Sequence, residues 1–205
     1  MPQNDWNSDE PLNPDADLII RCQAGDQPAF EELIELYRTR VASIAYQVLG
    51  NYEDARDVSQ EVFIKLYRGI SKFDLNKKFF TWLYRLTINA SIDFLRAKKR
   101  RSKENSIEER QDQYLNIPNP EYDSTVTEIE RRELRQLFVQ LAEQLNPKQR
   151  AAFILCDLHG FTSDETAEVM LCPKVTLRWY LHEARKRIRK MIVEQHPEYW
   201  QGKRK

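Results

Sequence analysis

The sequence predicts an all-α protein with two helical domains joined by a flexible linker. Apolar residues recur at spacings of three and four along two long stretches, and no run alternates as a β-strand would. Between these stretches, residues 102–128 are acidic, lose the periodicity and contain two prolines. The chain has 32 Lys+Arg and 32 Asp+Glu in 205 residues, but the basic residues gather in two separate blocks. Each domain therefore has its own basic segment.

The first domain is expected over residues 17–101, after an acidic N-terminal tail of residues 1–16. Glycines and helix-capping residues divide it into four helices. Their expected ranges are Asp17–Ala24, Asp26 to about Leu49, Tyr52 to about Gly69, and about Phe79–Lys99. A loop, Ser71 to Lys78, precedes the last of them.

The second domain is expected over residues 129–195, followed by a basic C-terminal tail of residues 196–205. Asn146 and Pro147 begin one helix, and Thr162 with Glu165 forms a capping box at the start of a short one. After a tight turn, a final helix runs from Val175 towards His196. A short helix, a turn and a basic helix are typical of a helix-turn-helix motif.

The two basic blocks indicate two surfaces that face a polyanion. Residues 65–101 carry eleven basic and two acidic residues, and residues 174–205 carry ten and three. In the final helix, a basic stripe runs beside an apolar one, and its side chains could reach the phosphates or base edges of a major groove. The stripe consists of Lys174, Arg178, His182, Arg185 and Arg189. The alternative is a solvated basic helix that complements its own dipole.

In residues 65–101 the basic residues are interleaved with aromatic ones, which suits single-stranded nucleic acid. These aromatic residues are Tyr67, Phe73, Phe79, Phe80, Trp82 and Tyr84. The alternative is that they form the core, which is plausible in part for Phe79 and Trp82. Phe73 lies in a polar loop, so a core role is less expected for it.

Nothing in the sequence indicates catalysis, a cofactor or a metal site. The three cysteines are widely spaced and form no disulfide framework, the three histidines lack metal-type spacing with them, and there is no glycine-rich phosphate loop. No apolar run reaches the ~20 residues of a membrane span, and the acidic start does not resemble a signal peptide. Asp54, Asp57 and Glu61 share one helix face, expected to be solvated or protein-binding. We therefore expect a soluble, cytoplasmic protein that is not an enzyme.

Several segments in order resemble bacterial RNA polymerase sigma factors of the extracytoplasmic-function (ECF) group within the sigma-70 family. In the first domain these are AGDQPAFEELIELY, LGNYEDARDVSQEVFIKLYR and FFTWLYRLTINASIDFLRAKKRR, and in the second LNPKQRAAFILCDLHGFTSDETAEVM and EARKRIRK. The resemblance covers about residues 17–101 and 129–192. It implies that the domains are sigma region 2 and sigma region 4.

The resemblance also implies roles for matching positions. The polymerase-binding residues would be Asp54, Asp57, Gln60, Glu61 and Phe63. Those for the minus-ten element, including the loop that captures a flipped base, would be Phe73, Lys77, Lys78, Trp82, Tyr84, Arg85, Asn89 and Arg96. Those for the minus-thirty-five element would be Lys174, Thr176, Arg178, Trp179, His182, Glu183 and Arg185.

The chain departs from the family pattern at a few of these positions. The family usually has Gly where Leu171 and Val175 stand, and a basic residue where Glu183 stands. In the loop, Leu75 and Lys77 replace the usual Gly and Ser. We therefore expect promoter preferences that differ from the family's usual ones.

The resulting hypothesis is a sigma factor that binds core RNA polymerase and promoter DNA, both duplex and single-stranded. The family also implies an anti-sigma protein as a partner, which could hold the chain at the inner membrane without its own membrane insertion. Two alternatives remain. One is a helix-turn-helix regulator that acts without polymerase, which leaves the acidic helix face and the aromatic loop unexplained. The other is a sigma-like decoy that binds an anti-sigma protein and never binds DNA.

Overall fold

The computed structural model describes residues 13–104 and 126–199, and within these ranges every regular element is a helix or a helical turn. The chain divides into two compact units, residues 1–115 and 116–205. This confirms the expected all-α fold with two helical domains. The predicted flexibility of the linker concerns mainly residues 105–125, which lie outside the described residues.

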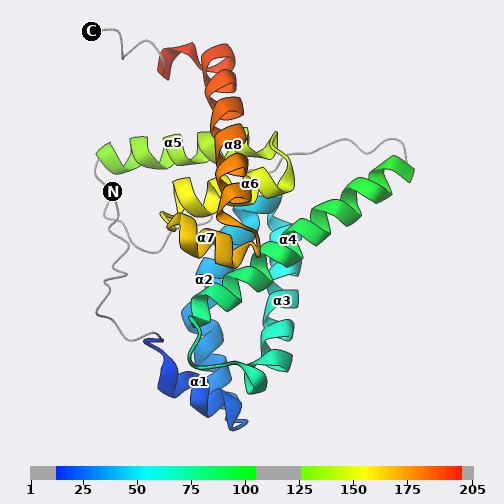
Figure 1. The fold of residues 1–205 in the computed structure, drawn as a ribbon, viewed down its shortest axis with the longest axis vertical. Helices are drawn as coiled ribbons and strands as arrows, with labels where there is room; N and C mark the ends of the chain where they lie inside the picture. Colours follow the sequence, from blue (N-terminus) through cyan, green and yellow to red (C-terminus); the bar gives the residue numbers. More distant parts are fainter. Residues whose placement is uncertain (1–12, 105–125, 200–205) are drawn as a thin grey trace. The chain divides into compact units, whose positions relative to one another are not determined.

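Unit 1 is a bundle in which α2 packs against α3 and α4, while α1 packs against α2 (Figure 1). Its elements are α1 (Ala16–Gln23), α2 (Gln27–Leu49), α3 (Tyr52–Gly69), the 3-10 turn η1 (Ile70–Lys72) and α4 (Phe79–Glu104). The buried side chains come from one stripe of each helix and include Leu33, Val41, Ile44, Val58, Val62, Leu66, Leu83 and Ile88. The opposite faces of α3 and α4 are left for other contacts.

Local signals determine where these helices begin and end. The carboxylate of Asp26 accepts a hydrogen bond from the backbone N–H of Ala29, and Gly50 ends α2 in the left-handed conformation with a φ of 75°. Asn51 then caps α3 by accepting a hydrogen bond from the N–H of Asp54. The observed ends agree with the expected ones to within a residue or two for α1, α2 and α3.

Unit 2 is built around α8, which packs against α5, α6 and α7. Its elements are α5 (Val126–Glu143), α6 (Pro147–Phe153), the π-helical turn η2 (Ile154–Leu158), α7 (Ser163–Val169), α8 (Lys174–Gln195) and the 3-10 turn η3 (Pro197–Tyr199). The predicted capping box is present, because Thr162 and Glu165 exchange side-chain and backbone hydrogen bonds. In the turn between α7 and α8, Leu171 adopts a φ of 48°, the left-handed conformation that favours glycine.

The structure corrects several expected boundaries. Residues 102–104 continue α4 and residues 126–128 begin α5, so these ends of the predicted linker are helical. The predicted N-terminal tail is wrong for residues 13–16, because Asn13 is buried and α1 begins at Ala16. At the other end, residues 197–199 form η3, which packs against α8, rather than a tail.

Candidate nucleic-acid and polymerase interfaces

One face of α4 carries the predicted minus-ten residues that reach the surface. Trp82, Asn89 and Arg96 are seven residues apart, and Arg85 lies beside them, so all four fall within a ~60° sector of the helix. Asn89 and Arg96 are exposed, while Trp82 and Arg85 are half-buried. Arg96 also forms an ion pair with Asp93, at 3.3 Å, on the same face. The sequence thus places a ring, an amide and a guanidinium along one exposed stripe.

The loop before α4 adds a second ring to this stripe. Phe73 stacks on Trp82, with ring centroids 5.0 Å apart and an interplanar angle of 20°, and meets Phe79 edge-on. Phe73 is half-buried, so it packs against other rings without being part of the fully buried core. Lys77 is exposed, and the ammonium group of Lys78 lies 5.4 Å from the ring centre of Phe80.

Tyr84 does not belong to this surface. It is only 3% exposed, and its position on α4 is about 160° away from Trp82, on the side that faces the core. Burial raises the pKa of its phenol. The prediction that Tyr84 contacts DNA came from its place in a segment, and its helical face excludes it in this conformation.

The exposed face of α3 carries most of the predicted polymerase-binding residues. Asp57, Gln60 and Glu61 are exposed, and Glu61 pairs with Lys65 at 2.6 Å. Asp54 is engaged within the unit, since its carboxylate accepts a hydrogen bond from Lys98 of α4 at 2.6 Å. Phe63 is half-buried at the border of the core.

The sequence reasoning missed Ile64, which lies between these polar residues on α3 and is 51% exposed. Protein interfaces have an apolar centre and a polar rim, and Ile64 with its charged neighbours is compatible with this arrangement. The signal was available, because Ile64 falls outside the apolar stripe formed by Val58, Val62 and Leu66.

On α8, the side chains that point most directly away from the core are partly apolar. Val175 is 75% exposed and Trp179 is 55% exposed, and they are followed on the same face by His182 and Lys186. This face is opposite to the buried stripe of Leu177, Leu181, Ala184, Ile188 and Met191. Val175 and Lys186 were absent from the predicted site, although their helical positions relative to that stripe mark them as outermost.

The other predicted minus-thirty-five residues flank this outer face. Arg178 is exposed, whereas Thr176 and Glu183 are half-buried, with Glu183 4.0 Å from the imidazole of His182. Lys174 pairs with Asp164 of α7 at 2.7 Å. Arg185 donates hydrogen bonds to both carboxylate oxygens of Asp157 in η2, at 3.1 and 2.8 Å. Two of the predicted DNA-contacting cations are therefore held by acidic residues of the same unit.

Two further features of the described residues concern metal binding and free thiols. Within those ranges, no group of three or more His, Cys, Asp or Glu side chains is arranged to hold a metal ion. Cys22, Cys156 and Cys172 are free thiols, and burial raises the pKa of each.

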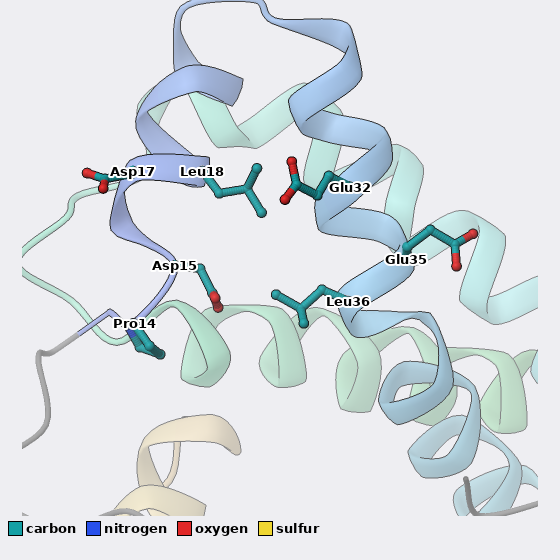
Figure 2. A pocket seen from close by; sticks show the side chains of 7 residues that line it. All are labelled: Pro14, Asp15, Asp17, Leu18, Glu32, Glu35 and Leu36. Carbon is teal, nitrogen blue, oxygen red and sulfur yellow. The ribbon is translucent and has the colours of Figure 1, made fainter.

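A cleft lies between α1 and α2, and Figure 2 shows Leu18 and Leu36 pointing into it. Its acidic lining residues are Asp15, Asp17, Glu32 and Glu35. Four carboxylates would repel a nucleic acid from this cleft.

Known proteins match both units. The family model for sigma-70 region 2 matches residues 33–101, and the model for sigma-70 region 4 matches residues 135–188. The chain is 31% identical over 187 residues to the ECF RNA polymerase sigma factor SigW of Bacillus subtilis, covering 85% of this chain and 94% of that protein. It belongs to the ECF sigma factors of the sigma-70 family. The expected resemblance is thereby confirmed.

Further comparisons agree with this family. The ECF RNA polymerase sigma-E factor of Escherichia coli is 35% identical over 178 residues, covering 83% of this chain and 90% of that protein. The sigma factor RpoE of Bartonella quintana, solved in complex with the anti-sigma factor NepR, shares the fold with a TM-score of 0.62 at 19% identity, covering 82% of this chain and 98% of that chain.

Membership of the family establishes the general function. ECF sigma factors are transcription initiation factors, without catalytic activity of their own, that bind core RNA polymerase and direct it to specific promoters. Among the residues the structure describes, no helix is both long and apolar enough to cross a membrane.

Proposed function

We propose that this sigma factor divides its work among three surfaces: α3 docks on the polymerase, the Phe73–Arg96 face of unit 1 binds the unpaired minus-ten strand, and the outer face of α8 binds the minus-thirty-five duplex. The observation that carries the proposal is the exposed stripe on α4. There the ring of Trp82, on which Phe73 of the preceding loop stacks, lies along one side of α4 with an exposed amide and a guanidinium.

For the minus-ten strand, the stripe offers all the groups that unpaired bases require. Phe73 and Trp82 supply a stacking platform, Asn89 offers a donor and an acceptor to a base edge, and Lys77 and Arg96 attract phosphates. A base extruded from the duplex can stack at the exposed side of this platform. Stacking of this kind contributes ~1–3 kcal/mol per base.

For the polymerase, Ile64 provides an apolar centre within an acidic rim that includes Asp57 and Glu61. Such a surface suits a basic, partly apolar helix on the polymerase. Asp54 has a different role here, since its bond to Lys98 ties α3 to α4. We assign it to the position of the docking helix rather than to direct contact.

For the minus-thirty-five element, α8 presents two apolar side chains at its tip. Val175 and Trp179 can contact the methyl group of thymine in a major groove, while Arg178, His182 and Lys186 reach base edges or phosphates. The outer apolar pair favours a preference for thymine at the positions that it faces. The second candidate, a decoy that never binds DNA, does not require these exposed cations.

The chain is proposed to act without enzymatic activity, in the cytoplasm, where polymerase and promoter DNA are found. An anti-sigma protein is proposed as its regulator, since the Bartonella quintana sigma factor of the same fold was solved with one. Such a partner would restrain the chain by covering one or more of the three surfaces.

The direct test is transcription by purified core polymerase with the full-length chain on a randomised promoter library. Asn89→Asp keeps the size of the side chain but removes its N–H donors, so it should abolish promoter opening while binding to core polymerase persists. Arg38→Ala is a suitable control. Arg38 is an exposed residue of α2, outside the three proposed surfaces, and it forms an ion pair with the neighbouring Glu35. Normal transcription by Asn89→Asp would contradict the assignment of this face, and no transcription by the unmodified chain would favour the decoy.

A further inference from the structure

Asn13 makes three hydrogen bonds to the loop and helix that form the proposed minus-ten surface. Its side-chain Nδ2 donates to the carbonyl oxygens of Leu75, at 2.8 Å, and Lys77, at 3.0 Å. Its Oδ1 accepts a hydrogen bond from the backbone N–H of Phe79 at 2.7 Å. The first N–H of α4 is therefore capped by a residue 66 positions earlier in the chain. Only 6% of Asn13 is exposed, so water cannot readily replace these bonds.

A second amide holds the other end of the same loop. The side-chain Nε2 of Gln23, near the end of α1, donates to the carbonyl oxygens of Ile70, at 3.0 Å, and Phe73, at 2.8 Å. Gln23 and Asn13 together satisfy four backbone carbonyls between residues 70 and 77. Within the loop, the backbone N–H groups of Phe73 and Lys77 donate to the carbonyl oxygens of Ile70 and Asp74. The carboxylate of Asp74 also accepts hydrogen bonds from Asn76.

The segment that carries Asn13 is itself anchored. The phenol of Tyr37 on α2 donates a hydrogen bond to the carboxylate of Asp15, and the ring of Tyr37 packs edge-on against Phe79 at 5.3 Å. Figure 2 shows Pro14 and Asp15 leading into α1 at the edge of the cleft. Asn13 is thus fixed to α2 on one side and to the start of α4 on the other.

From this geometry we infer that Asn13 and Gln23 are positioning residues for promoter recognition. They hold residues 70–77 in the conformation that stacks Phe73 on Trp82 and presents the loop to the extruded base. The inference rests on the proposed role of this loop in capturing the minus-ten strand. Neither residue needs to touch DNA, because both act through the backbone of the loop.

The decisive variants exchange an amide for a carboxylate of the same size. Asn13→Asp keeps the acceptor for the N–H of Phe79 but removes both donors and places a negative charge against two carbonyl oxygens. Gln23→Glu does the same to the carbonyls of Ile70 and Phe73. Gln27→Glu is the matched control, since Gln27 is an exposed amide whose side chain bonds to Glu31 and not to the loop.

The full-length variants should be measured for binding to a single-stranded minus-ten oligonucleotide selected from the promoter library. We expect Asn13→Asp and Gln23→Glu each to weaken binding roughly ten-fold, as for loss of buried hydrogen bonds. Gln27→Glu should bind nearly as the unmodified chain does, and binding of the duplex minus-thirty-five element should not change in any of them.

Two further measurements report on the loop itself. In a chain with Trp82 as the only tryptophan, acrylamide should quench its fluorescence more readily once the Phe73 ring is released. At lower pH the new carboxyl group in Asn13→Asp becomes protonated and regains a donor, so part of the lost affinity should return.

Phe73→Ala separates failure of this inference from failure of the proposed function. If Phe73→Ala weakens single-strand binding but Asn13→Asp and Gln23→Glu do not, the loop captures DNA without the two amides and the inference is wrong. If Phe73→Ala has no effect either, the loop does not bind the strand and the proposed function is wrong at this surface. A loss of helical content in Asn13→Asp, measured by circular dichroism, would indicate unfolding of unit 1, which also overturns a specific positioning role.

Discussion

Arg185 and Asp157 form a bidentate ion pair within unit 2, in which Nε and Nη2 of the guanidinium each donate to one carboxylate oxygen. The pair joins the proposed DNA-reading helix α8 to the π-helical turn η2. Arg185 is therefore held in a fixed orientation before any DNA is present, and Asp157 cancels part of the charge that it would offer to a phosphate.

Asp157→Asn should strengthen duplex binding if Arg185 contacts a phosphate. Removing the carboxylate leaves the full positive charge of Arg185 available, so the salt dependence of binding should also become steeper, by about one counterion. Fluorescence anisotropy over a range of salt concentrations measures both effects. Arg185→Ala should bind more weakly than the unmodified chain, and weaker binding by Asp157→Asn would instead show that the pair serves to aim Arg185.

Glu183 is predicted either to bind a base or to repel the duplex. Glutamate can accept a hydrogen bond from the amino group of cytosine, and it repels phosphates. If Glu183 binds a base, Glu183→Arg should change the preferred minus-thirty-five sequence and lose ~1–3 kcal/mol on the native site. If it only repels, the variant should bind all duplexes more tightly, with a steeper salt dependence. Selection from a randomised duplex pool distinguishes the two, and no change in either property would remove this side of α8 from the interface.

The acidic face of α3 should be required for polymerase binding. Asp57→Lys combined with Glu61→Lys reverses the charge of the exposed rim, so binding to core polymerase should be lost while the helical content stays normal. Ile64→Ala should weaken binding by ~1–2 kcal/mol if it fills an apolar pocket. Co-elution with core polymerase in size-exclusion chromatography provides the measurement. Co-elution of the double variant at normal affinity would contradict this docking surface.

Leu171→Gly should stabilise unit 2. A left-handed conformation costs a non-glycine residue ~1–2 kcal/mol, and the greater freedom of glycine in the unfolded chain offsets ~0.5–1 kcal/mol of that gain. Leu171 is largely exposed, so little burial is lost. We expect a net gain of up to about 1 kcal/mol in urea unfolding, with a smaller gain for Leu171→Asn. A clear loss of stability in Leu171→Gly would show that the leucine side chain makes a stabilising contact.

His159 should make unit 2 sensitive to acid. Burial lowers the pKa of its imidazole to about 3, and the charge of Arg135 acts in the same direction. The unfolded chain, with a histidine pKa of ~6.5, binds the proton first as the pH falls. The free energy of unfolding is therefore highest above about pH 6.5. Below that pH it falls by ~1.4 kcal/mol per pH unit, which amounts to a loss of ~2 kcal/mol at pH 5. Unfolding midpoints between about pH 7.5 and 4.5 should show a shallower decline in His159→Gln than in His182→Gln, and equal slopes would contradict the assignment.

The sequence predicted what depends on local interactions. Most helix ends in unit 1 follow from residues such as Asp26, Gly50 and Asn51, whose bonds lie within a few residues. The turn before α8 was also expected, and Leu171 in it adopts the left-handed conformation that favours glycine. The polymerase and promoter roles came from the family resemblance, because the spacing of apolar residues indicates helices but not their binding partners.

Contacts between distant segments could not be predicted in this way. Asn13 was assigned to a tail because its partners lie 62–66 residues away. Phe73 lies in the loop as expected, but its stacking on Trp82 depends on how the loop folds back onto α4. Tyr84 was a different kind of error. Its helical face could have been calculated from the sequence, but the resemblance assigned a whole segment at once.

The length of α4 sets a distance that matters for transcription. Its 26 residues span about 39 Å, from the loop anchored by Asn13 to the turns beyond Lys98, whose ammonium group is bonded to Asp54 of α3. The helix therefore keeps the loop proposed to capture the melted strand at a fixed separation from the attachment to α3, the proposed docking helix. With the roles proposed above, the first melted base should lie at a fixed offset from the polymerase surface that binds α3, so the protein itself would set where the transcription bubble begins.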